Sequence, residues 1–377
     1  MNIGIEAQRL FRPKKHGIEI VALELIRHLQ EIDKKNQYFV FVKPDLDDQC
    51  IRETENFKII KIPGFSYPSW EQWNLPRAIG KYRLDVLHCT ANTAPLRPGV
   101  KTVITLHDVI FLESVSFKGT AYQNIGNLYR RFIVPKVAKK NFLVTVSEFE
   151  RKNIMDTLGI PASQIEVAYN AVNPMFRVID DPVILNAAKL KYGLPDQFIL
   201  FFANPAPKKN TPNVLAAFAH YCRNYGNSTV KLLVTDSSLQ YIQGLIQSLE
   251  LKDIADRIQI IDYINYNDLP AVYNLARLFL YPSFRESFGL PILEAMASGT
   301  PVISSNTSAM PEIAGNAALL TDPHNAREIG DTIARLLQND ITRQALRANG
   351  LENVKRFSWN NTAIKMLGIY QKLAKEK

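Results

Sequence analysis

Residues 281–305 read YPSFRESFGLPILEAMASGTPVISS, and this stretch decides the fold. Apolar runs at 278–281 and 301–304 predict two buried strands. Between them, Pro291 suits the first turn of a short helix, because its fixed φ is helical and its missing N–H would be unpaired there. Gly299 suits a left-handed helix end. The stretch therefore predicts a strand–helix–strand unit whose helix begins just past the carboxyl end of a parallel strand.

The start of this helix is a candidate ligand site. The backbone amides of Phe288, Gly289 and Leu290 precede or open it, and amides at a helix N-terminus favour anions. Glu286 in the turn and Glu294 on the helix bracket the site. Because a carboxylate repels phosphate, we expect the glutamates to bind hydroxyl groups of a sugar or ribose. The alternative is a surface helix with two solvated glutamates.

The same stretch carries a family resemblance. The two glutamates, Phe-Gly-Leu-Pro, the Glu-Ala-Met-Ala-Ser-Gly helix and Thr-Pro-Val resemble, in register, the E-x7-E signature of retaining, nucleotide-sugar-dependent glycosyltransferases of family 4. This resemblance implies an α/β, GT-B fold, with two doubly wound Rossmann-like domains facing each other across a cleft. It implies that Glu286, with the amides of Phe288 and Gly289, holds donor-sugar hydroxyls and that Glu294 binds the nucleotide ribose.

Short apolar runs predict two sets of parallel strands. The first set comprises residues 2–6, 38–42, 57–62, 86–89, 102–106 and 142–146, and the second comprises 198–202, 231–234, 259–261, 277–280, 302–304 and 318–320. An irregular, proline-marked segment at 173–182 reads as a linker. We predict an acceptor-side domain over 1–175, a nucleotide-sugar-binding domain over 183–357, and a helix in 358–377 that, as in GT-B proteins, returns to the first domain.

Composition fits this organisation. A chain of 377 residues exceeds one ordinary core, and 46% apolar with 21% charged residues is typical of a globular protein. Since there is no apolar run of about 18 residues and no signal peptide, we expect a cytoplasmic protein. Cys50, Cys89 and Cys222 lack metal-ligand spacing and read as reduced thiols.

A basic turn follows the strand predicted at 198–202. It reads Asn204-Pro205-Ala206-Pro207-Lys208-Lys209-Asn210, and two lysines at a strand-to-helix junction are placed to neutralise a diphosphate. The run resembles the Pro-Arg-Lys-Asn element of family 4, with Lys208 at the arginine position, which implies that Asn204, Lys208 and Lys209 bind the donor. Lysine cannot make arginine's bidentate contact. The alternative is a plain basic loop.

Three further candidates lie in the first half of the chain. Thr105-Leu106-His107-Asp108 resembles the Thr-x-His-Asp element of a mannosyltransferase-like subgroup. His107 could donate a hydrogen bond to a donor phosphate or sugar hydroxyl, and its pKa near neutrality would let it carry positive charge. The alternative is a histidine whose ring is satisfied by backbone. Asp108 would orient His107 or touch the acceptor. In family 4 a loop near donor and acceptor often carries several glycines, and Gly17 is the only one of them that this sequence keeps.

Charge leaves two interpretations open. The net charge is +9, and the second half of a helix predicted at 121–140 is crowded with basic residues, namely Arg130, Arg131, Lys136, Lys139 and Lys140. Such a face is either simply solvated or meets anionic lipid headgroups, each charge then contributing about 1 kcal/mol. Asp45-Leu46-Asp47-Asp48 is superficially the Asp-x-Asp metal motif of the other large glycosyltransferase fold, but we interpret it as a solvated loop.

The resemblance implies a retaining, metal-independent hexosyltransferase that uses a GDP-mannose or UDP-sugar type of donor and no further cofactor. The acceptor would be a saccharide or polyprenyl-linked saccharide, in surface polysaccharide synthesis, with the protein cytoplasmic or peripheral on the inner membrane face. The residues expected to carry catalysis are Glu286, His107 and Lys209. No nucleophile stands out, which suggests front-face attack assisted by the leaving phosphate. The alternatives are a nucleotide-sugar 2-epimerase, a non-catalytic sugar-nucleotide sensor and, least supported, a nucleic-acid-binding protein.

Overall fold

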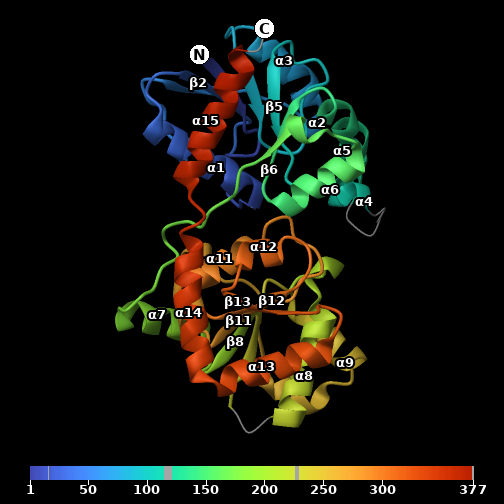
Figure 1. The fold of residues 1–377 in the computed structure, drawn as a ribbon, viewed down its shortest axis with the longest axis vertical. Helices are drawn as coiled ribbons and strands as arrows, with labels where there is room; N and C mark the ends of the chain where they lie inside the picture. Colours follow the sequence, from blue (N-terminus) through green and yellow to red (C-terminus); the bar gives the residue numbers. More distant parts are fainter. Residues whose placement is uncertain (16, 114–120, 226–228, 376–377) are drawn as a thin grey trace. The chain divides into compact units, whose positions relative to one another are not determined.

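The computed structural model describes residues 1–15, 17–113, 121–225 and 229–375. The chain divides into two compact units (Figure 1). The first unit consists of Met1–Asn170 together with Ser358–Lys377, and the second of Ala171–Phe357.

The first unit contains a seven-stranded sheet in the order β3-β2-β1-β4-β5-β6-β7, with all neighbours parallel. Its strands are β1 (Asn2–Glu6), β2 (Gln37–Val42), β3 (Phe57–Lys61), β4 (Val86–Cys89), β5 (Lys101–Thr105), β6 (Phe142–Thr145) and β7 (Ile165–Val167). In chain order, β2 and β3 are added on one side of β1, and β4 to β7 are then added on its other side. The switch point between β1 and β4 is where a doubly wound sheet opens a crevice at its carboxyl edge.

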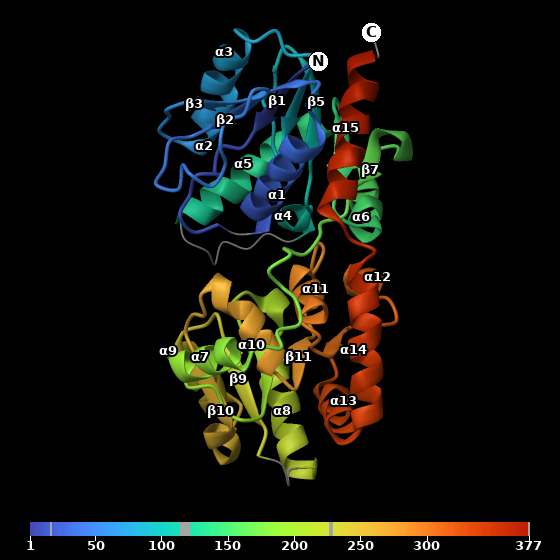
Figure 2. The same cartoon turned by 90° about the vertical axis from the view of Figure 1, so that its left-hand side faces the viewer.

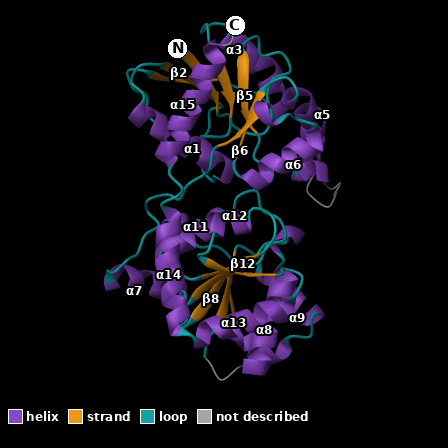
Figure 3. Cartoon of the chain, viewed as in Figure 1, coloured by secondary structure: helices purple, strands orange, loops and turns teal. Residues whose placement is uncertain are grey.

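Helices cover this sheet on both faces (Figure 3). They are α1 (Gly17–Ile32), α2 (Tyr67–Ser69), η1 (Trp70–Asn74), α3 (Leu75–Ile79), α4 (Ile110–Glu113), α5 (Ala121–Ala138), α6 (Glu148–Leu158), η2 (Ala162–Gln164) and α15 (Trp359–Lys375). The C-terminal helix α15 lies beside α1 (Figures 1 and 2). Tyr370 Oη on α15 lies 2.8 Å from His88 Nδ1, and His88 Nε2 lies 2.7 Å from Thr105 Oγ1. These contacts anchor the end of the chain to the first sheet.

The second unit contains a six-stranded parallel sheet in the order β10-β9-β8-β11-β12-β13. Its strands are β8 (Phe198–Phe202), β9 (Lys231–Thr235), β10 (Ile258–Ile261), β11 (Leu278–Tyr281), β12 (Val302–Ser305) and β13 (Ala318–Thr321). Its helices are α7 (Pro182–Tyr192), η3 (Pro207–Lys209), α8 (Thr211–Tyr225), α9 (Leu239–Ser248), η4 (Lys252–Arg257), η5 (Tyr266–Asp268), α10 (Leu269–Leu275), α11 (Leu290–Ala297), α12 (Met310–Ala314), α13 (Ala326–Gln338) and α14 (Asp340–Val354). The switch point here lies between β8 and β11.

Both sheets confirm the predicted α/β, doubly wound class. The strand–helix–strand unit predicted from residues 281–305 is β11–α11–β12, with Gly289 at φ +97° before the helix and Gly299 at φ +74° after it. Each predicted strand is present with its ends shifted by at most one residue. The three-residue edge strand β7 was not predicted, because three residues are too few to show a period.

Candidate functional site

The loops that follow β8 and β11 bring three predicted residues together at the switch point of the second sheet. The Glu286 carboxylate lies 2.7 Å through Oε1 from Lys209 Nζ and 3.7 Å through Oε2 from Lys208 Nζ. We call Lys208, Lys209 and Glu286 the lysine–glutamate cluster. Ligands of parallel sheets bind at this edge, outside the carboxyl ends of the strands. The structure therefore places two ammonium groups and one carboxylate where a phosphorylated ligand would bind.

Asn210 fixes the lysines in place. Its side chain is buried, and Nδ2 donates to the carbonyl oxygens of Pro282 at 2.9 Å and Pro323 at 2.7 Å. The Phe284 N–H also donates to the Lys208 carbonyl at 2.8 Å. Asn210 adopts φ +62°, a left-handed conformation that asparagine tolerates better than most residues. The two loops are thus tied together by hydrogen bonds to backbone.

The backbone of Glu286 is held by a residue that sequence reasoning missed. The Glu286 N–H donates to Ser308 Oγ at 3.1 Å, and this hydroxyl donates in turn to the Glu286 carbonyl at 2.6 Å. Ser308 lies beyond β12 and adopts φ +59°. A serine in a loop gives no sequence signal for such a role, because the contact spans 22 residues and depends on a left-handed backbone.

Glu286 is held as a carboxylate. Burial alone would raise its pKa, but the charges of Lys209 and Lys208, together with hydrogen bonds from Lys209 and the Tyr281 hydroxyl, outweigh burial and lower it. Lys209 Nζ also donates to Tyr281 Oη at 3.1 Å. An ammonium group has three N–H donors, and the described contacts use two of them. Lys209 can therefore contact an anion without releasing Glu286.

Glu294 on α11 has a different environment. Only 9% of it is exposed, and Tyr273 Oη donates to its Oε2 at 3.1 Å. Burial raises the pKa of Glu294 to about 7, the Tyr273 hydrogen bond opposes this, and the charge of Asp236 adds to it. With Glu286 only 8% exposed, the alternative of two solvated glutamates is wrong. The two carboxyl groups differ instead, one charged and one titrating near neutrality.

The remaining donor-side candidates shape the loops. Phe288 is buried, and its ring centroid lies 5.7 Å from that of Phe357. Gly289 precedes Leu290, the first residue of α11, and its carbonyl accepts from the Ile292 N–H at 2.9 Å. Asn204 is exposed, and its Oδ1 accepts from the Ala206 N–H at 2.9 Å, which organises the basic turn.

His107, Asp108 and Gly17 belong to the first unit. His107 is buried, and its Nε2 lies 2.9 Å from the Thr90 carbonyl, so this ring nitrogen is paired with backbone. Burial lowers its pKa, although the Thr90 contact and nearby carboxylates oppose this. Burial therefore disfavours the positive charge expected from the sequence. Asp108 Oδ1 accepts from the Ile110 N–H at 3.2 Å, and Gly17 is the exposed first residue of α1.

The acidic segment at 45–48 lies outside the cluster and has a structural explanation. Asp47 pairs with Lys15, and Asp48 pairs with Lys61 at 2.8 Å, which supports the loop interpretation of this segment. No group of three or more histidine, cysteine or acidic side chains able to hold a metal ion is found in the part of the chain that the structure describes. Among the same residues, no helix has the length and apolar character needed to cross a membrane.

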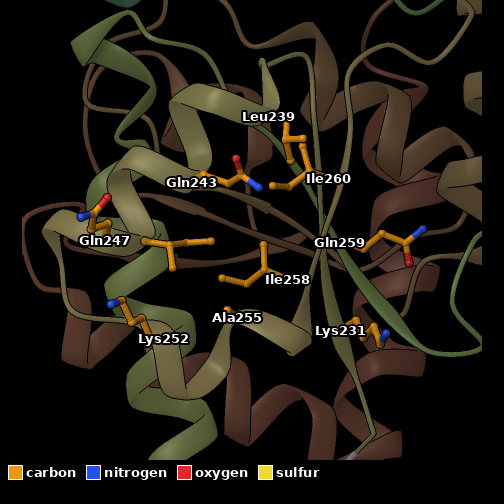
Figure 4. A pocket seen from close by; sticks show the side chains of 10 residues that line it. Lys231, Leu239, Gln243, Gln247, Lys252, Ala255, Ile258, Gln259 and Ile260 are labelled. Atoms are coloured by element: carbon orange, nitrogen blue, oxygen red, sulfur yellow. The ribbon is translucent and has the colours of Figure 1, made fainter.

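A broad hollow of about 640 Å³ lies elsewhere on the second unit, lined by residues of α9, η4, β9 and β10 (Figure 4). Its polar lining includes Lys231, Gln243 and Lys252, with no carboxylate. None of the predicted site residues lines it. The lysine–glutamate cluster, at the carboxyl edge of the same sheet, is the better candidate site.

Comparison with known structures supports the fold. Sucrose-phosphate synthase from Thermosynechococcus elongatus is 20% identical with a TM-score of 0.73, and covers 99% of this chain and 98% of its own. A glycosyltransferase from Rickettsia africae is 19% identical with a TM-score of 0.74, and the match covers 100% of this chain and 99% of that structure. These similarities identify the fold as GT-B.

Sequence comparison identifies the family. Residues 16–176 match the model described as Glycosyltransferase Family 4, and residues 186–353 match Glycosyl transferases group 1. O-antigen chain mannosyltransferase B of Escherichia coli is 32% identical over 61% of this chain and 60% of its own length. Serotype-specific mannosyltransferase WbdA of E. coli is 31% identical over 70% of this chain, which spans 32% of that relative. The chain therefore belongs to the GT-B glycosyltransferases, with a Family 4 region in its first unit and a group 1 region in its second.

Proposed function

We propose that the protein is a retaining, metal-independent glycosyltransferase that moves a hexose from a nucleoside-diphosphate sugar to a saccharide or polyprenyl-linked saccharide. The lysine–glutamate cluster carries this proposal. It combines cations for a diphosphate with a charged carboxylate for sugar hydroxyls, at the sheet edge where such ligands bind.

Lys208 and Lys209 act on the leaving group in this proposal. Charge accumulates on the nucleoside diphosphate as the sugar departs, and preorganised cations stabilise it most strongly in a site that excludes water. The N-terminal end of α11, which begins at Leu290 shortly after Glu286 in the sequence, adds a partial positive charge. Lys209 can contribute its third N–H without breaking its contacts to Glu286 and Tyr281.

Glu286 acts on the sugar. Its carboxylate accepts hydrogen bonds from sugar hydroxyls, and its charge favours an oxocarbenium-like transition state. A carboxylate paired with two ammonium groups is a weak nucleophile, which supports front-face attack over a covalent intermediate. Glu294 binds the ribose hydroxyls.

His107 takes part as a neutral ring. If Nε2 donates to the Thr90 carbonyl, Nδ1 is left as a hydrogen-bond acceptor for a sugar hydroxyl. This role replaces the donor role expected from the sequence. Asp108 and Gly17 remain predictions for the acceptor side.

The relatives suggest the donor and the pathway class. Both curated relatives described above are named as mannosyltransferases, and one of the names refers to the O-antigen chain. GDP-mannose is therefore the first donor to test, and surface polysaccharide is the proposed product class.

The helix α5 supports a peripheral membrane location on the cytoplasmic face. Its apolar side chains Ile125, Leu128 and Phe132 are 64%, 65% and 58% exposed. Basic residues follow them, and Lys136 Nζ lies 3.1 Å from the centroid of the Phe132 ring. An exposed face with both apolar and basic groups suits an anionic lipid surface. Co-sedimentation with phosphatidylglycerol vesicles, but not with phosphatidylcholine vesicles, tests this location.

The activity is tested by a thermal-shift panel of GDP-, UDP- and ADP-sugars, followed by transfer to a lipid-linked acceptor. We expect one donor to raise the melting temperature and the product to keep the anomeric configuration of the donor. An inverted product would contradict retention. Transfer that stops in excess EDTA and returns with a divalent cation would contradict metal independence.

A further inference from the structure

The switch point of the first sheet carries a second, smaller site. A narrow hollow lies here, lined by the end of β1 and the loop after it, by α1 and α2, and by the residues after β4. Its lining includes Glu6, Arg9, Glu19, Tyr67 and Thr90. The space for a water-sized group inside it is about 10 Å³, which admits roughly one hydroxyl group or water. It lies entirely within the first unit, at the carboxyl edge where ligands of parallel sheets bind.

Two polar atoms at this hollow have no hydrogen-bond partner among the residues that the structure describes. Glu6 is 1% exposed, and its Oε1 accepts from the Gln8 N–H at 2.9 Å, while Oε2 has no hydrogen-bond partner among the described residues. Arg9 Nε is likewise buried without a hydrogen-bond partner in the described part of the chain. Folded proteins rarely leave such groups unpaired, and a ligand is one explanation when they do.

Two other contacts hold the Arg9 guanidinium group in place. Its Nη1 lies 3.9 Å from Glu19 Oε1, and its carbon lies 4.8 Å from the centroid of the Tyr67 ring. These contacts position Arg9 and leave Nε as the atom to be satisfied by something else.

A neighbouring buried acid shows that the unpaired oxygen is particular to Glu6. Glu71 is also 1% exposed, yet it accepts hydrogen bonds from Thr93, from Tyr129 Oη at 2.5 Å and from Gln72 Nε2 at 2.9 Å. Its two oxygens are satisfied by the fold. Burial raises the pKa of Glu6 to about 7, and the Glu71 charge adds to this rise. Backbone hydrogen bonds from Gln8 and Thr90 and the charge of Arg9 oppose it.

We propose that Glu6 and Arg9 bind one hydroxyl group of the acceptor saccharide, which donates to Glu6 Oε2 and accepts from Arg9 Nε. A hydroxyl group offers both a donor and an acceptor and matches the size of the hollow. A phosphate group fits poorly, because Glu6 and Glu19 outnumber Arg9. This inference rests on the proposed function and assigns its acceptor specificity to the first unit.

The experiment measures binding of the methyl α-pyranosides of mannose, glucose and galactose to the full chain by saturation-transfer NMR and calorimetry. GDP-mannose and UDP-glucose are titrated in parallel. The variants are Glu6→Gln, which keeps the side-chain shape, and Arg9→Lys, which keeps the charge but removes Nε. Glu31→Gln on the exposed side of α1 is the matched control.

We expect at least one pyranoside to bind the wild-type chain, and Glu6→Gln and Arg9→Lys each to weaken it by about 10- to 100-fold, as for loss of a hydrogen bond to a charged group. One monodeoxy derivative of that pyranoside, which lacks the bound hydroxyl group, should bind the wild-type chain more weakly than the parent sugar does. Glu6→Gln should bind this derivative and the parent sugar with equal affinity. Nucleotide-sugar affinity and the control should not change.

Equal pyranoside affinity in wild type and both variants, or no pyranoside binding to wild type, would overturn the inference. Weakened nucleotide-sugar binding with unchanged pyranoside binding would assign the hollow to the donor and also overturn it. If Glu6→Gln does not fold, Arg9→Lys decides alone. Failure of the proposed function would give a separate result: neither GDP-mannose nor UDP-glucose would bind the wild-type chain.

Discussion

Replacing Glu286 with glutamine tests the lysine–glutamate cluster most directly. The substitution preserves the size of the side chain and removes its charge. It leaves Lys209 and Lys208, whose side chains are 21% and 38% exposed, without the carboxylate that lies 2.7 and 3.7 Å away. Both the stability of the second unit and the chemistry should respond.

The stability change follows from these contacts. A hydrogen bond to a charged group contributes about 1.5–3 kcal/mol, and a neutral amide oxygen that still accepts from Lys209 retains about 1 kcal/mol. Because water partly screens both lysines, we expect the free energy of unfolding to fall by about 1–2 kcal/mol. For a unit of this size, that lowers the melting temperature by roughly 2–8 °C.

The pH dependence gives an independent check. The pKa of Glu286 is lowered in the folded protein, so its stabilising effect is present above the ordinary glutamate pKa and is lost as pH falls through the folded value. Wild type and Glu286→Gln should therefore differ in stability at pH 7 and converge in acid. A constant difference across this range would contradict the charged-cluster interpretation.

The catalytic change should be larger. Removing one preorganised electrostatic group typically lowers kcat by about 10²–10³-fold. The assay is transfer of radiolabelled hexose from the donor identified by thermal shift, with circular dichroism to confirm folding. Glu352→Gln, on the exposed face of α14 and paired with Lys355, is the matched control. A folded Glu286→Gln variant with wild-type transfer rate would refute the assignment.

Three further changes have defined outcomes. Lys208→Arg introduces bidentate phosphate contact and should lower the donor KM by about 3- to 10-fold, measured by steady-state kinetics; an unchanged or higher KM would argue against phosphate contact at this position. Glu294 has a folded pKa of about 7 against an ordinary value of 4.5, so the free energy of unfolding should fall by up to about 3 kcal/mol as pH rises between these values. This fall should be absent in Glu294→Gln, as measured by urea unfolding at pH 5 and pH 8; a fall of the same size in the variant would contradict the assignment. Gly289→Ala forces φ +97° on alanine and brings its Cβ to 3.3 Å from Ile292 Cδ1, so urea unfolding should show a loss of about 1–2 kcal/mol; no loss would mean that this turn adapts.

Local sequence patterns predicted the elements and several of the site residues. The strand ends, the proline at the start of α11 and the glycines around it depend on residues only a few positions apart, so the sequence shows them directly. The lysine pair and Glu286 could likewise be placed at strand ends. Their direct contact could not be predicted, since it joins residues 77 positions apart.

The sequence by itself determined the two parallel sheets, the family signature and the residue types at the strand ends, because backbone preference and hydrophobic period are local. Only the tertiary structure decided the state of each group. It paired Glu286 with two lysines and buried Glu294, so that one carboxyl is charged and the other titrates near neutrality. It lowered the pKa of His107 and, among the described residues, left one oxygen of Glu6 without a hydrogen-bond partner, because burial and hydrogen bonding depend on neighbours brought from distant parts of the chain.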